Sequence, residues 1–340
     1  MFERIFKLSE HKTTVKTEVM AGITTFMTMA YILAVNPSVL GSTGMDTTAV
    51  LLATALASCL GTLCMAFMAN LPFALSAGMG LNAFMAYTVV AGYGYSWQVA
   101  LLAVFIEGLI FIVLSLTNVR EAIFNAIPLT LKKGVSVGIG LFIAFIGLQN
   151  SGLCVDSATL VGIISFPENF HTAGICALLT LIGLFFTAVF YTRKMKGAIL
   201  YGILLTWILG MLCQVTGLYV PTPDAGFYSL FPSWGMTDFS KLGLTFGQCF
   251  NVDFSAVGIV NFIVVIFSFL FVDIFDTLGT LIGVATKAKM LDKDGKLPGI
   301  KPALLADSIA TSAGAILGTS TTTTFVESAS GVAVGGRTGL

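Results

Sequence analysis

Long apolar runs recur along the chain and limit what it can fold into. A helix of about 20 apolar residues spans the hydrocarbon layer of a membrane. Because 56% of the 340 residues are apolar and only 10% are charged, the chain lacks the polar surface that a soluble domain of this length needs. We expect an all-α polytopic membrane protein with spans at about 19–40, 48–69, 97–117, 134–150, 173–191, 197–217, 256–285 and 301–319.

Two shorter segments, 75–90 and 320–334, are rich in small residues and are also predicted to lie at membrane depth. With both counted and the N-terminus in the cytoplasm, 16 of the 17 Lys and Arg residues fall inside, and only Lys241 falls outside. Cytoplasmic connections of membrane proteins carry this excess of basic residues. Leaving out either segment inverts every later connection and removes the asymmetry. The sequence therefore predicts ten crossings of the cell membrane.

The connections contain few features beyond their charges. Residues 118–133 (NVREAIFNAIPLTLKK) are amphipathic and flanked by basic residues, so we expect them to lie along the cytoplasmic interface. The first residues are charged and do not resemble a cleavable signal peptide, so the first apolar run is expected to direct insertion itself. The six cysteines form no CxxC pair, and no metal centre or redox centre is expected.

The two short segments suggest an internal symmetry. SAGMGLNAFMAY (76–87) and GTSTTTTFVESASGVAVGG (318–336) lie seven crossings apart in the predicted topology. An odd offset gives the two halves opposite orientations, which is the arrangement of an inverted repeat. Short, glycine-interrupted segments at corresponding places indicate a transporter binding site. A helix that begins at mid-membrane exposes backbone N–H groups that can hold a polar ligand, and such backbone persists only where protein or a cavity satisfies it.

Carboxylates occur within or beside the apolar segments, although the topology places no basic residue at membrane depth. Carboxyl groups in such positions are costly to keep charged and often belong to proton pathways. Asp273 and Asp276 in FVDIFDTLGT are separated by three positions and are expected to share one helix face. The complete set is Glu107, Asp273, Asp276, Asp307 and Glu327.

Each of these residues has a structural interpretation beside the functional one. Asp276 either supports a site or holds two helices together, whereas Glu107 and Asp307 favour structural hydrogen bonds or gating. Asn82 in GMGLNAFM offers a donor and an acceptor, which suits either a heterocycle edge or an inter-helix hydrogen bond. The threonines 321–324 are expected mainly to satisfy loosened backbone.

Several long motifs resemble one transporter family. The motifs are GITTFMTMAYILAVNP (22–37), SAGMGLNAFMAY (76–87), GIGLFIAFIGLQNSG (138–152), FVDIFDTLGT (271–280) and TSTTTTFVESASG (319–331). Together and in this order they resemble the nucleobase:cation symporter-2 superfamily, and within it the AzgA-like branch of guanine/hypoxanthine/adenine permeases.

The resemblance implies an inverted seven-helix repeat with a core domain, a gate domain, and half-helices in the third and tenth spans. It assigns residues 1–117 (spans 1–4) and 256–340 (spans 8–10) to the core, 118–133 to the interfacial linker and 134–255 (spans 5–7) to the gate. The family continues beyond the tenth span, so about 10 of 14 spans are expected in these residues.

The same resemblance implies a site between the two short segments and the eighth and first helices. Asp273 and Glu327 would face a purine, with Asn82 opposite and Asp276 supporting the site or its conformational change. From the residues themselves, the candidates for proton coupling or support are Asp276, Glu327 and Asp307. Thr25 and Phe26 are weaker candidates, and backbone groups around Phe84 and Phe325 would also contribute.

The implied function is import of guanine, hypoxanthine or adenine by proton symport through an elevator-type movement, with Na⁺ as the other candidate coupling ion. Transport of another nucleobase or xanthine is the first alternative. A Mg²⁺-dependent membrane transferase is a second, but it would need more carboxylates and cavity-facing Lys or Arg. No enzyme activity, cofactor, metal or nucleic acid is expected. The expected partners are a purine, the lipid bilayer and, at the level of the family, a second copy of the chain.

Overall fold

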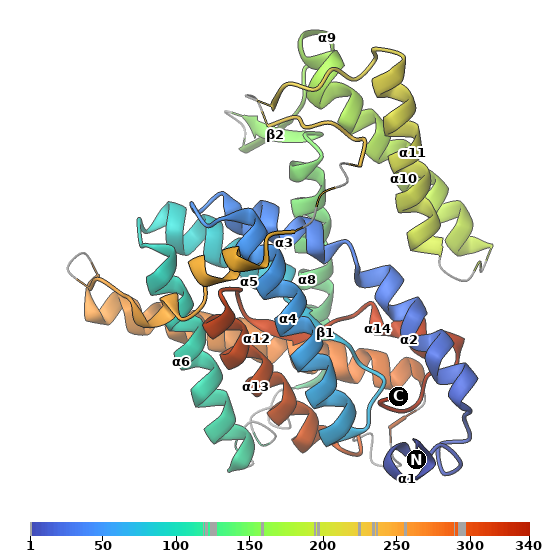
Figure 1. The fold of residues 1–340 in the computed structure, drawn as a ribbon, viewed down its shortest axis with the longest axis vertical. Helices are drawn as coiled ribbons and strands as arrows, with labels where there is room; N and C mark the ends of the chain where they lie inside the picture. Colours follow the sequence, from blue (N-terminus) through green and yellow to red (C-terminus); the bar gives the residue numbers. More distant parts are fainter. Residues whose placement is uncertain are drawn as a thin grey trace. The chain divides into compact units, whose positions relative to one another are not determined.

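The computed structural model describes residues 2–340 apart from 118, 120–121, 123–127, 158–159, 194, 196–197, 224–225, 233–234, 236, 255–256, 289 and 292–296. The chain divides into two compact units (Figure 1). One consists of Met1–Ile139 with Thr237–Leu340, and the other is Gly140–Met236. The assignment of core and gate domains stays a prediction. Half of the predicted linker 118–133 lies outside the described residues, and its last part, from Leu129, belongs to a helix.

The first unit consists of helices and two very short strands. Its N-terminal part contains α1 (Phe2–Phe6), α2 (Val15–Met29), α3 (Ile32–Gly41), α4 (Thr47–Cys64) with a π-helical turn (Met65–Ala69), β1 (Leu75–Ala77), α5 (Met79–Ala83) with a π-helix (Phe84–Gly92), α6 (Trp97–Leu116) and the start of α8 (Leu129–Asn150). Its C-terminal part contains two 3₁₀ turns (Phe239–Leu244 and Gln248–Phe250), α12 (Ile259–Ala288), α13 (Ile300–Leu317), β4 (Thr322–Thr324) and α14 (Ser328–Val334).

The second unit contains a hairpin that the sequence interpretation missed. Strands β2 (Cys154–Ser157) and β3 (Leu160–Ile163) pair antiparallel within the stretch interpreted as a plain outward connection. The hairpin is followed by α9 (Phe166–Asn169), a π-helical turn (Phe170–Gly174), α10 (Ile175–Thr192) and α11 (Ala198–Val215). Helices α10 and α11 pack through reciprocal small residues, since Thr206 lies against Gly183 and Thr187 lies against Gly202.

Six helical segments in the described part of the chain are long and apolar enough to cross a membrane, so the chain is a helical polytopic membrane protein. Shorter apolar helices cover Met79–Gly92 and Tyr201–Val215. The predicted number of ten crossings stays a prediction. The six segments are Val15–Gly41, Thr47–Ala69, Trp97–Leu116, Phe166–Thr192, Ile259–Thr286 and Ile300–Leu317.

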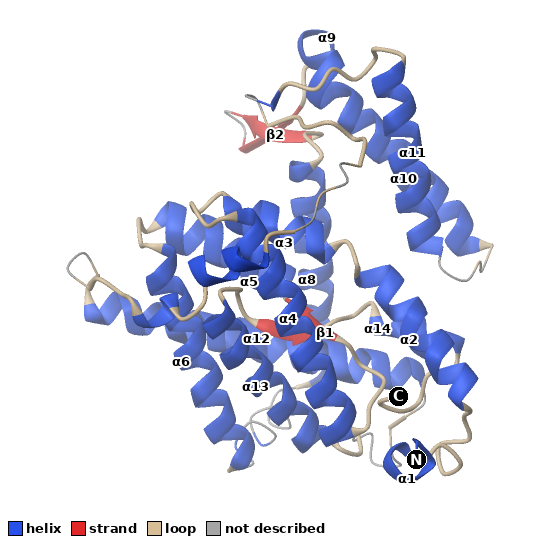
Figure 2. Ribbon diagram, in the orientation of Figure 1, coloured by secondary structure: helices blue, strands red, loops and turns tan. Residues whose placement is uncertain are grey.

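The two short segments meet in an antiparallel pair of strands. Leu75 pairs with Thr324 and Ala77 with Thr322, and Figure 2 shows β1 among the helices of its unit. The pairing continues beyond the strands, because Gly78 donates its N–H to the carbonyl of Thr321 at 2.9 Å. Each extended stretch is followed by a helix, as the resemblance implied. The strands satisfy each other's backbone where no regular helix can do so.

The span predicted over 19–40 is present as Val15–Gly41, and it consists of two helices. The structure ends α2 at Met29 and begins α3 at Ile32, so Ala30 and Tyr31 form a break within the first span. Helix α2 packs on α14, where Thr28 and Ser330 share a hydrogen bond of 2.8 Å between their hydroxyls. Tyr31 lies at this break, and its hydroxyl reaches Glu327, the residue before α14.

A capped helix start and an ion pair join two connections that the sequence places outside. The carboxylate of Asp46 accepts a hydrogen bond from the N–H of Ala49 at 2.9 Å, as an N-cap residue does. The ammonium of Lys241 lies 3.3 Å from the same carboxylate. The Ala49 N–H, together with Lys241, lowers the pKa of Asp46 below its usual value. The one basic residue predicted outside therefore has an acidic partner from another connection.

Helix α13 packs closely against α6 and α4 through glycine. A Cβ atom built on Gly108 of α6 would lie 2.8 Å from the backbone nitrogen of Ser312 on α13, and one on Gly61 of α4 would lie 2.8 Å from the Cβ of Ala310. Small residues allow this approach of helix backbones in membranes.

We predict that Gly108→Val lowers the thermal unfolding midpoint of the detergent-purified protein, because the new side chain must displace the α13 backbone. Overpacking of this kind costs about 1–3 kcal/mol. Gly283→Val on α12 is the control, since no atom lies within 4 Å of a Cβ at that position. Equal midpoints for the two variants would contradict the packing described for α6 and α13.

Candidate substrate-binding site

The hydroxyl-rich segment before α14 is bonded to several different helices. Thr319 accepts a hydrogen bond from the amide of Asn36 on α3 at 2.9 Å. Ser320 donates to the side-chain oxygen of Asn82 on α5, and Thr321 donates to Glu107 on α6 at 2.9 Å. Successive side chains of one strand-like stretch therefore reach three helices.

The following residues continue the same pattern. The carbonyl of Thr322 accepts from the hydroxyl of Thr311 on α13 at 2.8 Å. The hydroxyls of Thr323 and Thr277 on α12 lie 2.7 Å apart, and Thr324 donates to Asp307 on α13 at 3.4 Å. The interpretation of Thr321–Thr324 as residues that mainly satisfy loosened backbone was therefore incomplete, because the hydroxyls of Thr321, Thr323 and Thr324 connect the segment to the surrounding helices.

Asp273 lies in a fully buried polar cluster between α12 and α13. Its carboxylate accepts a hydrogen bond from Thr277 one turn later at 3.1 Å. The same hydroxyl lies 3.1 and 3.2 Å from the two carboxylate oxygens of Asp307. Asp273, Thr277 and Asp307 have no exposed surface. The structure thus brings two of the predicted carboxylates together through a residue that the sequence analysis did not name.

Asp276 lies beside the paired strands β1 and β4. A Cβ atom built on Gly78 would be 3.5 Å from a carboxylate oxygen of Asp276 and 2.6 Å from the methyl group of Thr323. Gly78 therefore leaves room for this carboxylate next to the start of α5. Asp276 is half-buried, in contrast to Asp273.

Glu327 lies just before α14 and is also half-buried. The hydroxyl of Tyr31 donates to one oxygen of the Glu327 carboxylate at 2.6 Å. The ring of Tyr31 packs against a small buried apolar cluster that includes Phe325 and Met29. The break between α2 and α3 therefore positions a donor on the carboxylate that the resemblance assigns to the ligand.

Asn82 has one satisfied and one unsatisfied side-chain group. Its oxygen accepts from Ser320, while its NH₂ group has no hydrogen-bond partner in the described part of the chain. Asn82 is fully buried. Two positions later, Phe84 packs edge-on against Phe269 of α12, with ring centroids 5.0 Å apart. In this conformation Asn82 presents a hydrogen-bond donor rather than an acceptor.

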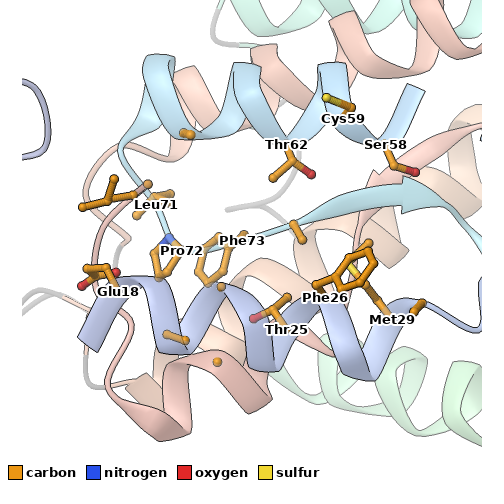
Figure 3. A pocket seen from close by; sticks show the side chains of 18 of the residues that line it. Glu18, Thr25, Phe26, Met29, Ser58, Cys59, Thr62, Leu71, Pro72 and Phe73 are labelled. Carbon is orange, nitrogen blue, oxygen red and sulfur yellow. The ribbon is translucent and has the colours of Figure 1, made fainter. Parts of the chain in front are cut away.

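A cavity of about 370 Å³ lies between α2, α4 and the segment that leads into β1 (Figure 3). Of the predicted site residues, only Thr25 and Phe26 line it. Its other walls are mostly apolar, with Ser58 and Thr62 contributed by α4 (Figure 3). The predicted polar and first-helix residues therefore separate into two groups. Thr25 and Phe26 line the cavity, whereas the carboxylates and Asn82 lie around the paired strands β1 and β4.

Sequence reasoning missed four polar residues that organise the site: Tyr31, Asn36, Thr277 and Ser320. Each is a polar residue within an apolar span or beside one, which is a weak signal that many packing residues share. No group of three or more His, Cys, Asp or Glu residues suited to a metal ion occurs in the described ranges.

The helical architecture, with buried carboxylates around the paired strands β1 and β4, is that of a membrane transporter. Residues 16–339 match the Xan_ur_permease profile, described as the permease family. The chain therefore belongs to this family of nucleobase:cation symporter-2 permeases and is not an enzyme.

Relatives of known name match almost the whole chain. The guanine/hypoxanthine permeases PbuO and PbuG of Bacillus subtilis are 44% and 46% identical over 99% and 98% of this chain, which covers 74% of each relative. The adenine permease AdeP of Escherichia coli is 42% identical over 100% of this chain and 72% of its own length.

A solved structure has a similar fold. The transmembrane domain of a cyanobacterial bicarbonate transporter, BicA, superposes with a TM-score of 0.61, over 96% of this chain and 78% of that one. The sequences are only 15% identical, so the likeness concerns the fold alone.

We predict that Asn36→Leu lowers the unfolding midpoint of the purified protein. Asn36 is fully buried and donates to Thr54 at 2.7 Å as well as to Thr319, so the substitution removes two buried hydrogen bonds, at a cost of about 1–3 kcal/mol. Asn261→Leu, at an exposed position of α12, is the control and should leave the midpoint within error of the wild type. A midpoint for Asn36→Leu at or above that of the control would contradict the assigned role.

Proposed function

We propose that this permease imports purine nucleobases across the cell membrane by proton symport, with its N-terminus in the cytoplasm. The proposal is supported by the relatives, whose names specify guanine, hypoxanthine or adenine. The main observation behind it is that Asp273, Asp276, Asp307 and Glu327 lie close together around the paired strands β1 and β4.

The proposed ligand fits the chemistry of these groups. A neutral purine carries ring N–H donors and ring nitrogen acceptors in one plane. Glu327 accepts from Tyr31 through one oxygen, and its second oxygen can accept a purine N–H. Asn82 offers an NH₂ donor to a purine acceptor. Asp276, half-buried beside Gly78, completes the acidic edge in the supporting role that the resemblance assigned to it.

Proton coupling follows from the cost of moving charge. Several carboxylates near one another in a region of low dielectric repel each other when ionised. Binding of a proton together with the purine lowers that charge, which makes it easier for the core to move past the gate. The elevator movement, the inverted repeat and a homodimer are parts of this proposal that rest on the family resemblance. Another nucleobase or xanthine as substrate, and Na⁺ as coupling ion, are the alternatives.

The first test is uptake of radiolabelled hypoxanthine, guanine, adenine and uracil in a bacterium that lacks its own purine permeases. We expect saturable uptake of a purine that collapses when a protonophore is added. Persistence of uptake with the protonophore, and its dependence on Na⁺, would replace the proton with sodium. No uptake of any base, despite normal membrane expression, would refute the proposed substrate class.

Glu327 provides the sharpest test of the site. We predict that Glu327→Ala abolishes high-affinity uptake, because the ligand loses its main acceptor. Glu327→Gln keeps the size and one acceptor oxygen, so it should bind purine more weakly than the wild type. The exposed Glu168→Gln on α9 is the matched control. Wild-type affinity in Glu327→Ala would contradict the assignment of this carboxylate to the ligand.

Tyr31 is predicted to act by positioning Glu327. Tyr31→Phe removes a hydrogen bond to a carboxylate, a type of bond worth about 1.5–3 kcal/mol, and retains the packing of the ring. We expect the KM for purine to rise about tenfold or more, in line with 1.4 kcal/mol per factor of ten, while the maximal rate changes little. Tyr87→Phe, at an exposed position, should have a wild-type KM. An unchanged KM in Tyr31→Phe would mean that the contact does not orient Glu327 for the ligand.

A further inference from the structure

One hydroxyl group lies within hydrogen-bond distance of four oxygen atoms. The Oγ1 atom of Thr277 is 3.1 Å from Asp273 Oδ1, 3.2 and 3.1 Å from the two carboxylate oxygens of Asp307, and 2.7 Å from the hydroxyl of Thr323. These four side chains come from α12, α13 and β4, and all are buried.

Counting hydrogens limits how this cluster can be satisfied. A threonine hydroxyl has one hydrogen to donate and two lone pairs that accept. If Thr323 donates to Thr277, the single hydrogen of Thr277 can go to Asp273 or to Asp307 but not to both. The carboxyl group that does not receive it is satisfied by the same hydroxyl only if it carries a proton itself and donates to the remaining lone pair.

The two arrangements differ only in where one proton lies. In the first, Asp307 is protonated and donates to Thr277, which donates to Asp273. In the second, Asp273 is protonated and donates to Thr277, which donates to Asp307. To pass between them, the Asp307 proton moves to Thr277 Oγ1 as the Thr277 hydrogen moves to Asp273 Oδ1. One proton is transferred, no bond to carbon changes and the charge of the pair stays constant.

Other groups near the cluster affect the balance between the two arrangements. Thr324 donates to Asp307 at 3.4 Å, which gives that carboxylate a second donor. Thr323 belongs to β4, so its bond to Thr277 links the hydroxyl to the segment that precedes Glu327. The titratable side chains of the elements packed around this part of α12 are Asp307 on α13, Glu107 on α6 and Glu327 before α14, with Asp276 on α12 itself.

We infer that Thr277 is a proton-relay hydroxyl that joins Asp273 and Asp307 into a pair holding one proton, and that this pair couples transport to the proton gradient. The inference rests on the proposed proton symport of purines and adds a residue to it. Asp273 lies on α12, three residues before Asp276, whereas Asp307 lies on α13. Thr277 positions and relays the proton without touching the purine.

The test compares Thr277→Val, which keeps the branched shape and removes the hydroxyl, with Thr277→Ser, which keeps the hydroxyl. Thr286→Val is the matched control, because the Thr286 hydroxyl on the same helix donates only to the carbonyl of its own helix at 2.6 Å. Each variant is assayed in proteoliposomes for hypoxanthine accumulation driven by a pH gradient and for exchange of labelled against unlabelled hypoxanthine without a gradient.

We expect Thr277→Val to lose at least tenfold in gradient-driven accumulation and to keep exchange within about twofold of the wild type, while Thr277→Ser and Thr286→Val keep both activities. Accumulation by Thr277→Val with the wild-type dependence on pH would overturn the inference. Loss of exchange together with accumulation would also overturn it, since that result describes a structural role. If the wild type neither accumulates nor exchanges hypoxanthine, the proposed substrate has failed, and the proton pair is then tested by the next measurement.

An infrared spectrum of the purified protein tests the pair without any substrate. A protonated aspartic acid has a carboxyl C=O stretching band that a carboxylate lacks. We expect one such band to disappear in Asp307→Asn, to shift in Thr277→Val and to stay unchanged in Thr286→Val. A spectrum of Thr277→Val identical to that of the wild type would overturn the shared proton, whatever the transport assays give.

Discussion

The pairing of β1 with β4 is the interaction on which the rest of the site depends. Extended backbone at membrane depth has no water to bond to, and each unsatisfied group costs several kcal/mol. Leu75, Ser76 and Ala77 solve this by pairing with Thr324, Thr323 and Thr322, and Phe325 extends the pairing by donating to the carbonyl of Ala74 at 2.9 Å. Because the backbone is satisfied between the two strands, the side chains of the second strand are free to bond to the surrounding helices.

Those side chains explain why the segment before α14 contains so many hydroxyl groups. A hydroxyl both donates and accepts, so it can connect an amide, a carboxylate or another hydroxyl without adding charge. Thr319 bonds to Asn36, Ser320 to Asn82, Thr321 to Glu107 and Thr323 to Thr277. Apolar residues at these places would remove one hydrogen bond from each of these side chains on four helices. The hydroxyl run is therefore the part of the chain that holds the site together, and the carboxylates alone do not define it.

Much of the fold could be predicted from the sequence because membrane thickness fixes the length of an apolar run. Helices α6, α12 and α13 lie close to the predicted runs for this reason. The break at Ala30 and Tyr31 could not be predicted, since nothing local distinguishes it from a continuous apolar helix. The carboxylates stood out in the sequence as charges in apolar surroundings. The role of Tyr31 depends on a partner 296 positions away, and that of Thr277 on partners 30 and 46 positions away. The residue type shows that burying a polar side chain costs free energy. The hydrogen-bond partner that offsets this cost depends on the tertiary structure.

The carboxylates of the site differ in burial, and this difference separates their roles. Asp273 and Asp307 are fully buried, and both carboxylates already lie within hydrogen-bond distance of Thr277. Asp276 and Glu327 are only half-buried, and Glu327 is held by a phenol hydroxyl that a ligand N–H could imitate. Binding energy from a purine is therefore available at the half-buried pair, while the enclosed pair is suited to storing a proton. Thr323 and Glu327 lie four positions apart, across the end of β4, so a ligand that shifts this segment also shifts the hydroxyl bonded to Thr277. Substrate and proton would then be linked through a short piece of backbone.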